Sequence, residues 1–524
     1  APSARAELWV TSAPDRGRTV HLDRESLEIF SNQTKAQDGQ IALRVIDSDP
    51  VCPCNETRNG NSFKYLRFSP AYLMGHNIQT MIESFSLPDP QPAKKPLAGR
   101  GAISFTDSRQ GVARLAAKMQ AEAERNLTRA FLWHETQSAV GQGGSPDEIA
   151  NMEKAFETLR AQGMEPPAPM VDTLASLKAA QTAVPGVKWR EAISDLAAQP
   201  ELGLFLRELW IDRGDEFRNN NEDLAQILLM REIMRRPTRQ NNAETMGLAR
   251  LAFPDLEQAA LTRPLPSALQ GRGVAPTDYL GLVLSAVDLF FREKMVVALQ
   301  PAHHLRWIAP KWGRLRQACS NDVAKEDRLE SLPFPTALVR PGQRLHRLAL
   351  NALALTGGSR DNEADLEEAD ALLREVYQLI GRHACKVYSQ PAVALDYDKA
   401  RLEPYRRAWA CPLSRRIFAY AIKGGSPLDP SRPMRPVVFP TARFAQRGGL
   451  TEAERSDLAD WLAQDPGVAA LKELGIWTGL HNRAVLYSPY MRAQEHSAQL
   501  QRSQLKDYED AFNTGKINLL ACST

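Results

Sequence analysis

The residues best suited to binding an anion lie in the stretch AISFTDSRQG at 102–111. A short apolar run leads there through a polar turn into an Ala-rich segment whose apolar residues have helical spacing. A helix that begins just after a strand presents free backbone N–H groups and a positive dipole to an anion. Thr106, Ser108 and Arg109 stand where a phosphate would bind. The alternative is that Asp107 or Ser108 only caps the helix.

Motifs that would make the chain a complete nucleotide hydrolase, a metalloprotease or a serine hydrolase are absent from the sequence. It contains no GxxxxGK[ST], GxGxxG, HExxH or GxSxG. The stretch NTGKIN at 513–518 lacks the upstream Gly and the following Ser or Thr that cradle phosphate and hold Mg²⁺. We therefore expect the chain alone to bind neither ATP nor Mg²⁺, and to be inactive as an ATPase.

The cysteines and histidines offer little support for metal or thiol chemistry. Six cysteines are scattered through the chain, which favours a reducing cytoplasm over a disulfide framework. Cys52 and Cys54 read as two unligated thiols in a loop, with a degenerate zinc ribbon as the alternative. His303 and His304 are adjacent, so on a helix they would point about 100° apart, and we expect solvated or capping histidines. Cys411 has no His at a predictable spacing to activate it as a nucleophile.

The composition is that of an ordinary folded protein, and the net charge is too small to attract a polyanion to the whole surface. The 524 residues are 43% hydrophobic, and 65 Lys and Arg face 62 Asp and Glu, so any nucleic-acid surface must be local. The best local patch is LRWIAPKWGRLR at 305–316, whose tryptophans could instead anchor a core. The most apolar stretch, 279–299, carries charges in its middle, so we expect a core helix and no membrane partner.

The elements that must position these residues alternate in type along the chain. Residues 1–50 have short alternating runs typical of strands, and 102–105 predicts a strand. The composition of 482–497 is strand-like, and the apolar run 517–521 predicts a last strand. Helical patterns occupy 68–85, 112–138, 147–162, 222–236, 277–299, 361–384, 451–463 and 501–512. Because a final strand normally needs neighbours, we expect the sequence to be an internal piece of a longer protein.

Three of these stretches, taken in order, carry a family resemblance. ISFTDSRQG, then EHSAQ, then YEDAFNTGKINLLACST, resemble the second RecA-like lobe of superfamily 2 (DEAD/DEAH-type) helicases. In that lobe a strand ending in a Ser-Arg turn precedes a His-Ser/Gly element, a helix ending in Phe-x-x-Gly, and a strand running into a Ser/Thr loop. The sequences of these motifs most resemble those of very large bacterial helicases linked to phage defence, of the Druantia or DISARM kind. The resemblance extends to NNAETMGLARLAFP at 241–254 and WACPLSRRIF at 409–418.

The resemblance implies a set of nucleic-acid-contacting residues in three motifs. They are Thr106, Ser108 and Arg109 in the fourth motif, His496, Ser497 and Gln499 in the element after it, and Ser523 and Thr524 in the fifth motif. It also implies an ATP-dependent helicase as the parent, with ATP and Mg²⁺ bound in a first lobe that this sequence does not contain. An arginine-finger motif is expected after residue 524. The implied partners are the backbone of DNA or RNA and other subunits of a defence system.

The expected fold is α/β: a RecA-like C-terminal helicase lobe split by a large, mostly α-helical insertion and preceded by a small β-rich segment. The expected divisions are 1–95, 96–140 for the first part of the lobe, 141–480 for the insertion and 481–524 for the rest of the lobe. AISF, a run within 484–495, and INLLA should then be parallel strands of one sheet. The competing function is a non-catalytic nucleic-acid-binding or scaffold subunit of a defence complex.

Overall fold

The computed structural model shows a mixed α/β protein and describes the chain with gaps. The described residues are 9–10, 18–23, 26, 28–31, 37, 39–46, 70–86, 95–106, 109–141, 146–161, 165–167, 170–171, 173–174, 186–211, 217, 220–234, 242–308, 315–320, 323–324, 331–334, 344–353, 363–389, 392–411, 414–441 and 450–523. The chain divides into two compact units, residues 1–73 and 74–524.

The first unit is a four-stranded antiparallel sheet in the order β1-β4-β2-β3. Its strands are β1 (Trp9–Val10), β2 (Arg18–Asp23), β3 (Ile29–Phe30) and β4 (Gln40–Ile46). Val20 and Val45, on the two long strands, are buried in its core. The prediction of strands in residues 1–50 is confirmed. Cys52 and Cys54 lie outside the described residues.

The boundary between the two units lies earlier than the expected division at residue 95. Helix α1 (Pro70–Glu83) begins at the boundary and continues into the second unit. Glu83 Oε1 lies 3.1 Å from Arg483 Nη1, and the side-chain amide of Gln79 donates to the carbonyl of Pro489 at 3.2 Å. These contacts tie the helix to residues near the end of the chain.

The second unit contains a three-stranded parallel sheet in the order β18-β19-β5. The strands are β5 (Ala102–Thr106), β18 (Ala493–His496) and β19 (Leu519–Ser523). β19 is the central strand and pairs in parallel with both neighbours. The predicted topology is therefore confirmed, although the whole stretch 107–492 separates β5 from β18 in the sequence.

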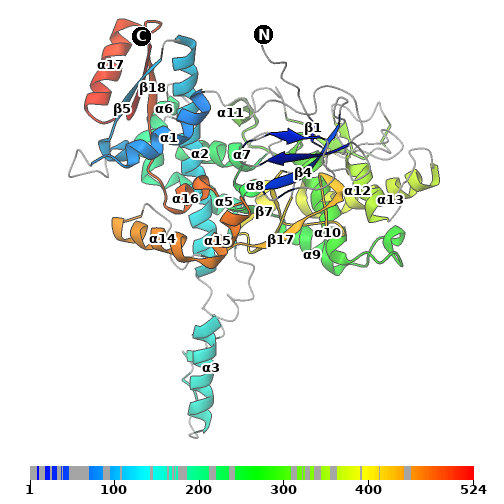
Figure 1. Cartoon of the computed structure of the whole chain (residues 1–524). Coiled ribbons are helices and arrows are strands. Elements are labelled where there is room, and N and C mark those ends of the chain that lie inside the picture. The colour runs from blue at the N-terminus through cyan, green and yellow to red at the C-terminus, as the bar shows by residue number, and fades with distance from the viewer. Residues whose placement is uncertain are drawn as a thin grey trace. The chain divides into compact units, whose positions relative to one another are not determined.

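Helix α17 (Arg502–Asn513) covers one face of this sheet (Figure 1). The ring of Phe512 packs against the cluster that includes Leu520 and Cys522 of the central strand. Gly101, just before β5, makes room for that ring, because a Cβ there would stand 2.9 Å from it. The predicted amphipathic helix at 501–512 is confirmed.

Helix α2 (Arg109–Gly141) covers the other face, as Figure 1 shows. Side chains alternate along a strand, so Leu519 and Ala521 point away from α17 and toward α2, and both are fully buried. Val112 and Leu115 belong to the apolar stripe of α2 and are buried as well. The predicted sequence of strand, turn and long helix is thus present.

Between α2 and β18 the described residues form many helices and four small sheets. The helical segments are α3 (Pro146–Ala161), α5 (Trp189–Ala197), α6 (Arg207–Ile211), α7 (Asn221–Ile233), α8 (Ala243–Met246), α9 (Pro254–Thr262), α10 (Pro276–Ala286), the π-helical turn η6 (Val287–Arg292), the short turn η7 (Ala302–His304), α11 (Leu305–Ile308), α12 (Arg344–Ala352), α13 (Glu363–Ala384), α14 (Glu452–Gln464), α15 (Pro466–Glu473) and α16 (Gly479–Val485).

The sheets of this region are built from very short strands. Their orders are β10-β11-β8-β9, β6-β12-β7, β14-β13-β17 and β15-β16. The strands are β6 (Val187–Lys188), β7 (Arg250–Ala252), β8 (Ala318–Cys319), β9 (Leu332–Pro333), β10 (Cys385–Ser389), β11 (Ala392–Leu395), β12 (Arg401–Glu403), β13 (Arg407–Ala410), β14 (Ile417–Phe418), β15 (Gly425–Ser426), β16 (Asp429–Pro433) and β17 (Arg435–Val438). The expected insertion therefore carries more β-structure than its sequence predicts.

Two predicted elements end differently in the structure. The helix predicted over 277–299 ends with η6, because Met295 adopts a φ of 61° and Val297 forms a parallel bridge with Leu395. The strand-like stretch 482–497 begins in helix α16 and becomes a strand only at β18. Of the helices in the described residues, none combines the length and the apolar character needed to cross a membrane.

Candidate nucleic-acid interface

The carboxyl ends of the three parallel strands meet at one edge of the sheet. Ser523 of β19 pairs with Thr106 of β5, and His496 of β18 pairs with Cys522 of β19. Neighbouring strands lie about 4.8 Å apart, so the three ends fall within about 10 Å. In open α/β sheets this edge is where ligands bind. The structure therefore brings together the three motifs that the resemblance implied.

Helix α2 begins beside this edge, at Arg109, three residues after the end of β5. The first turn of this helix contains no acidic residue, which favours an anion at its positive end. The helix runs to Gly141, long enough for a full helical dipole. Ser108 and Thr524 lie outside the described residues, and so do the side chains of Thr106 and Arg109, of which only the backbone is described. The backbone at the start of α2 is suited to an anion.

The His-Ser element after β18 makes internal contacts. His496 Nε2 lies 2.9 Å from Glu509 Oε1 on α17. The hydroxyl of Ser497 is buried, donates to the Glu495 carboxylate, and accepts the N–H of Gln499 at 3.4 Å. The side chain of Gln499 is exposed. Of the three residues, only Gln499 is oriented to meet a ligand without first exchanging a carboxylate partner.

Two carboxylates that were not among the predicted site residues lie at this edge. Glu495 lies inside β18 and Glu509 lies on the exposed side of α17, within the patterns EHSAQ and YEDAF. Their pairing with Ser497 and His496 depends on the crossover from β18 through α17 to β19. A Glu one residue before the His-Ser element is the signal that could have indicated it.

The basic and aromatic patch at 305–316 is described only in part. Trp307 of α11 packs edge-to-face against Trp210 and Phe217, with ring centroids 5.6 and 5.7 Å away. The guanidinium of Arg306 lies 5.1 Å from the centroid of the Trp307 ring. Within the described part, the tryptophan thus anchors an aromatic cluster, which favours the core interpretation of this patch.

The neighbouring histidine pair corrects one expectation. His303 is exposed, but His304 is completely buried and is not a solvated residue. Its Nε2 lies 3.6 Å from the carboxylate of Asp223 on α7. The reason is that the turn η7 and helix α11 pack against α7, which encloses the second histidine and leaves the first outside.

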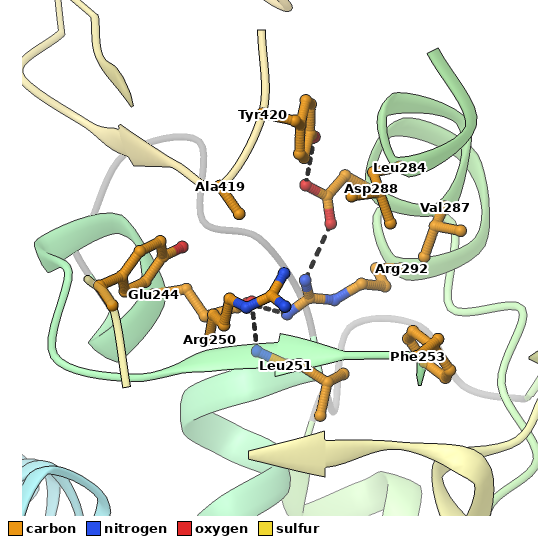
Figure 2. A pocket seen from close by; sticks show the side chains of 11 residues that line it. Glu244, Arg250, Leu251, Phe253, Leu284, Val287, Asp288, Arg292, Ala419 and Tyr420 are labelled. Carbon is orange, nitrogen blue, oxygen red and sulfur yellow. Dashed lines mark hydrogen bonds and ion pairs between the residues drawn. The ribbon is translucent and has the colours of Figure 1, made fainter. Parts of the chain in front are cut away.

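A buried cluster of charges organises the middle of the insertion. Arg292 Nη1 lies 2.8 Å from Asp288 Oδ1, and its other terminal nitrogen pairs with Glu244 of α8. The hydroxyl of Tyr420 donates to the second oxygen of Asp288 at 2.7 Å. Figure 2 shows Asp288 held between Tyr420 and Arg292. Glu244 also accepts the backbone N–H of Leu251 at 3.0 Å, which joins α8 to β7.

This charge cluster serves as a structural brace. Burial alone would lower the pKa of Arg292, but the carboxylates of Glu244 and Asp288 outweigh it and hold that pKa well above its usual range. The cavity beside these groups has a volume of about 20 Å³, enough for a single water. A substrate has no room there.

The described residues offer neither a metal cluster nor a reactive thiol. Among them, no three His, Cys, Asp or Glu side chains come close enough to share a metal ion. The described cysteines are buried, and burial raises the pKa of the Cys385 and Cys522 thiols. The sulfur of Cys411 lies 3.6 Å from the Ser426 hydroxyl. Such thiols are poor nucleophiles.

No protein-family model matches this chain, and no curated protein or solved structure matches it either. A functional proposal must therefore start from the residues and contacts of this chain alone. Among them, the aligned carboxyl ends of the parallel sheet have the most direct functional meaning.

Proposed function

We propose that this chain supplies the second RecA-like lobe of an ATP-dependent nucleic-acid helicase or translocase of superfamily 2. In the parent protein the lobe closes on a first lobe around ATP and moves its grip along one strand. Its own residues bind phosphates of the nucleic-acid backbone at the carboxyl edge of the sheet. ATP and Mg²⁺ are bound by the full-length parent, and this chain alone binds neither.

One observation carries the proposal: β5, β18 and β19 form one parallel sheet, in register, across the long insertion. The resemblance required this arrangement, and β5 is so far from β18 and β19 in the sequence that it has no local reason to pair with them. Loop closure across a long insertion costs little, because the entropic term grows only logarithmically with length. The sheet thus supports the order of motifs from which the helicase resemblance was drawn.

The chemistry proposed for the edge is backbone recognition. The first N–H groups of α2, the hydroxyls of Thr106 and Ser523, and the guanidinium of Arg109 suit a phosphate diester. Contacts of this kind position a strand and carry no sequence information. Binding should therefore depend steeply on salt and little on base sequence.

The test is equilibrium binding of fluorescent single-stranded oligonucleotides to the full chain over a series of salt concentrations. Arg109→Ala should weaken binding by about 1–3 kcal/mol for every sequence tried and reduce the salt slope by roughly one unit. Arg114→Ala is the matched control, because it removes an exposed arginine from the same helix about 140° further round the axis. Unchanged affinity in a folded Arg109→Ala protein would retire the phosphate contact.

The alternative, a non-catalytic nucleic-acid-binding or scaffold subunit, is favoured by the carboxylates of Glu495 and Glu509 at the same edge. They are hydrogen-bonded to His496 and Ser497, and their negative charge repels a phosphate placed nearby. If the wild-type chain binds no single strand at low salt, the scaffold function is the better assignment. If Glu509→Gln tightens binding, the carboxylates only restrain a working phosphate site.

A further inference from the structure

A second cavity lies in the insertion, where two stretches singled out by the sequence resemblance meet. Thr245 and Met246 come from 241–254, and Ser414 and Arg415 come from 409–418. The turn between α15 and α16 closes the cavity. Its volume of about 240 Å³ far exceeds the space around the buried charge cluster. The role proposed for the sheet edge does not involve this cavity.

Arg415 is the only cation among the described residues that line this cavity, because the buried His481 is neutral. Its side chain is exposed, and its guanidinium makes no hydrogen bond or ion pair within the described part of the chain. Its backbone has a φ of 54°, the left-handed region that a side chain other than Gly avoids. The left-handed backbone of Arg415 costs stability, and it places an exposed guanidinium beside a cavity, which points to a ligand.

Gly475 gives the guanidinium its place. It follows α15 with a φ of +64°, and a Cβ there would stand 2.8 Å from Nη1 of Arg415. The absence of a side chain at this turn therefore lets the guanidinium come close to the backbone. Two residues with positive φ, one from each side, thus shape the same wall of the cavity.

The remaining lining is neutral and rich in hydroxyls. The hydroxyls of Ser414 and Thr478 are on exposed residues at the rim, and that of Thr245 lies deeper. His481 is fully buried, which lowers its pKa to about 4, and its Nε2 contacts the carbonyl of Met246 at 2.9 Å. The imidazole is therefore neutral at physiological pH. Of the described residues that line the cavity, none carries a carboxylate.

We propose that this cavity binds a phosphate group, with Arg415 as its charged ligand and the hydroxyl of Ser414 as an additional donor, while the hydroxyl of Thr478 contacts Nδ1 of His481 at 3.1 Å. A guanidinium matches two phosphate oxygens at once, and hydroxyl groups can satisfy the others. The volume accommodates a phosphate with part of the molecule that bears it. The phosphate comes either from a nucleic-acid backbone or from a small phosphorylated molecule.

This pocket is separate from the edge of the parallel sheet. Helix α16, which follows the pocket, contacts α2 where His134 Nε2 lies 2.8 Å from the carbonyl of Val485. Along α2 that point is 25 residues from Arg109, which corresponds to about 37 Å. Phosphate binding in this pocket can therefore be tested independently of the proposed helicase function.

The experiment is isothermal titration of the full chain with inorganic phosphate at constant ionic strength. Wild type should bind phosphate, and Arg415→Gly should weaken binding by about tenfold to a hundredfold, the range of a charge-assisted hydrogen bond. Glycine accepts the left-handed backbone, so this variant should unfold at the same temperature as wild type or higher. Arg407→Ala, which removes an exposed arginine from β13, should leave phosphate binding unchanged.

The outcomes separate clearly. No heat of binding with wild type at millimolar phosphate, or equal binding by wild type and Arg415→Gly, would overturn the proposal. Should Arg415→Gly fail to fold, Arg415→Gln tests the same loss of charge with a side chain retained. Competition of bound phosphate by oligothymidylate assigns a nucleic-acid backbone, and competition only by thymidine monophosphate assigns a small phosphorylated ligand.

Discussion

Asn518 links the amino-terminal ends of all three strands of the parallel sheet and donates to the carbonyl of Arg100 across 418 residues of sequence. Its amide nitrogen also donates to the carbonyl of Pro96 at 2.8 Å, and its side-chain oxygen accepts the N–H of Arg492 at 3.0 Å. The residue is completely buried. One side chain thus satisfies backbone groups that precede β5 and β18 while standing at the start of β19.

We expect Asn518→Asp to destabilise the second unit by about 3 kcal/mol. The change replaces a donor of two hydrogen bonds with a carboxylate oxygen that faces two carbonyls, and each unsatisfied buried group costs about 1–3 kcal/mol. Chemical denaturation at neutral pH measures the loss. Asn513→Asp, at an exposed position near the end of α17, is the matched control and should change stability by less than about 0.5 kcal/mol. Equal stability of the two variants would contradict this role.

Arg292→Met should destabilise the protein by about 3–5 kcal/mol, because it leaves Glu244 and Asp288 buried without their cation. The exposed pair between Arg190 and Asp398 is the comparison, since a surface pair contributes at most about 1 kcal/mol. Arg190→Met should therefore have a small effect in the same denaturation experiment. A small effect of Arg292→Met would show that water or another cation reaches the cluster.

Local pattern was enough to predict individual elements of the parallel sheet and its helices, and the resemblance was needed to predict that they assemble. The apolar runs AISF and INLLA predict strands, and the spacing of apolar residues in the Ala-rich segment after AISF predicts a helix. Nothing local indicates that β5 pairs with β19. The link through Asn518 was equally hidden, because its partners are backbone carbonyls hundreds of residues away.

The strands of the insertion were harder to predict, because they are too short to show an alternation of apolar and polar residues. β7 and β12 have three residues each, and they pair because helices on either side bring them together. The stretch 482–497, in contrast, has the composition of a strand over more residues than form one. Its apolar residues, such as Tyr490 and Met491, are buried in an irregular segment before β18, so their strand-like composition reflects burial and not strand geometry.

His134 should make the protein less stable as the pH falls from 6.5 toward 4. Burial lowers its pKa from 6.5 to about 4, so in this window the unfolded chain binds a proton that the folded chain excludes. Its contribution is fully present above pH 6.5 and amounts to about 3 kcal/mol. His134→Gln should reduce the slope of stability against pH in this window by about 1 kcal/mol per unit.

The matched control for this pH experiment is His303→Gln, which removes an exposed imidazole. Glu83 and Glu403 have pKa values raised by burial, and they act with the opposite sign. Their effect is common to wild type and variant, so it cancels in the difference. An unchanged slope in His134→Gln would mean that this imidazole is protonated in the folded protein.

We expect purified residues 1–524 not to hydrolyse ATP, with or without single-stranded nucleic acid. Phosphoryl transfer needs a phosphate cradle and metal ligands, and the sequence has no GxxxxGK[ST] motif to supply them. Release of inorganic phosphate from ATP, followed with an oligonucleotide present, is the measurement. Stimulated hydrolysis by this chain would contradict the assignment of a single second lobe.

Phe105 should tolerate replacement by Lys, although it lies on a strand of the parallel sheet. It is 67% exposed, and its partner across the pairing, Cys522, faces α17. The helix therefore covers the central strand but not β5, whose outer side has no paired strand among the described residues. Such an apolar edge promotes association between chains.

Phe105→Lys should change the free energy of unfolding by less than about 0.5 kcal/mol and lower self-association in sedimentation velocity. Leu520→Ala is the control, because Leu520 lies on the same face and is buried, so its truncation should cost about 2–5 kcal/mol. If Phe105→Lys proves as costly as Leu520→Ala, the aromatic ring is covered in solution. The β5 edge would then be occupied, by another part of the chain or by a second molecule, and would not be open.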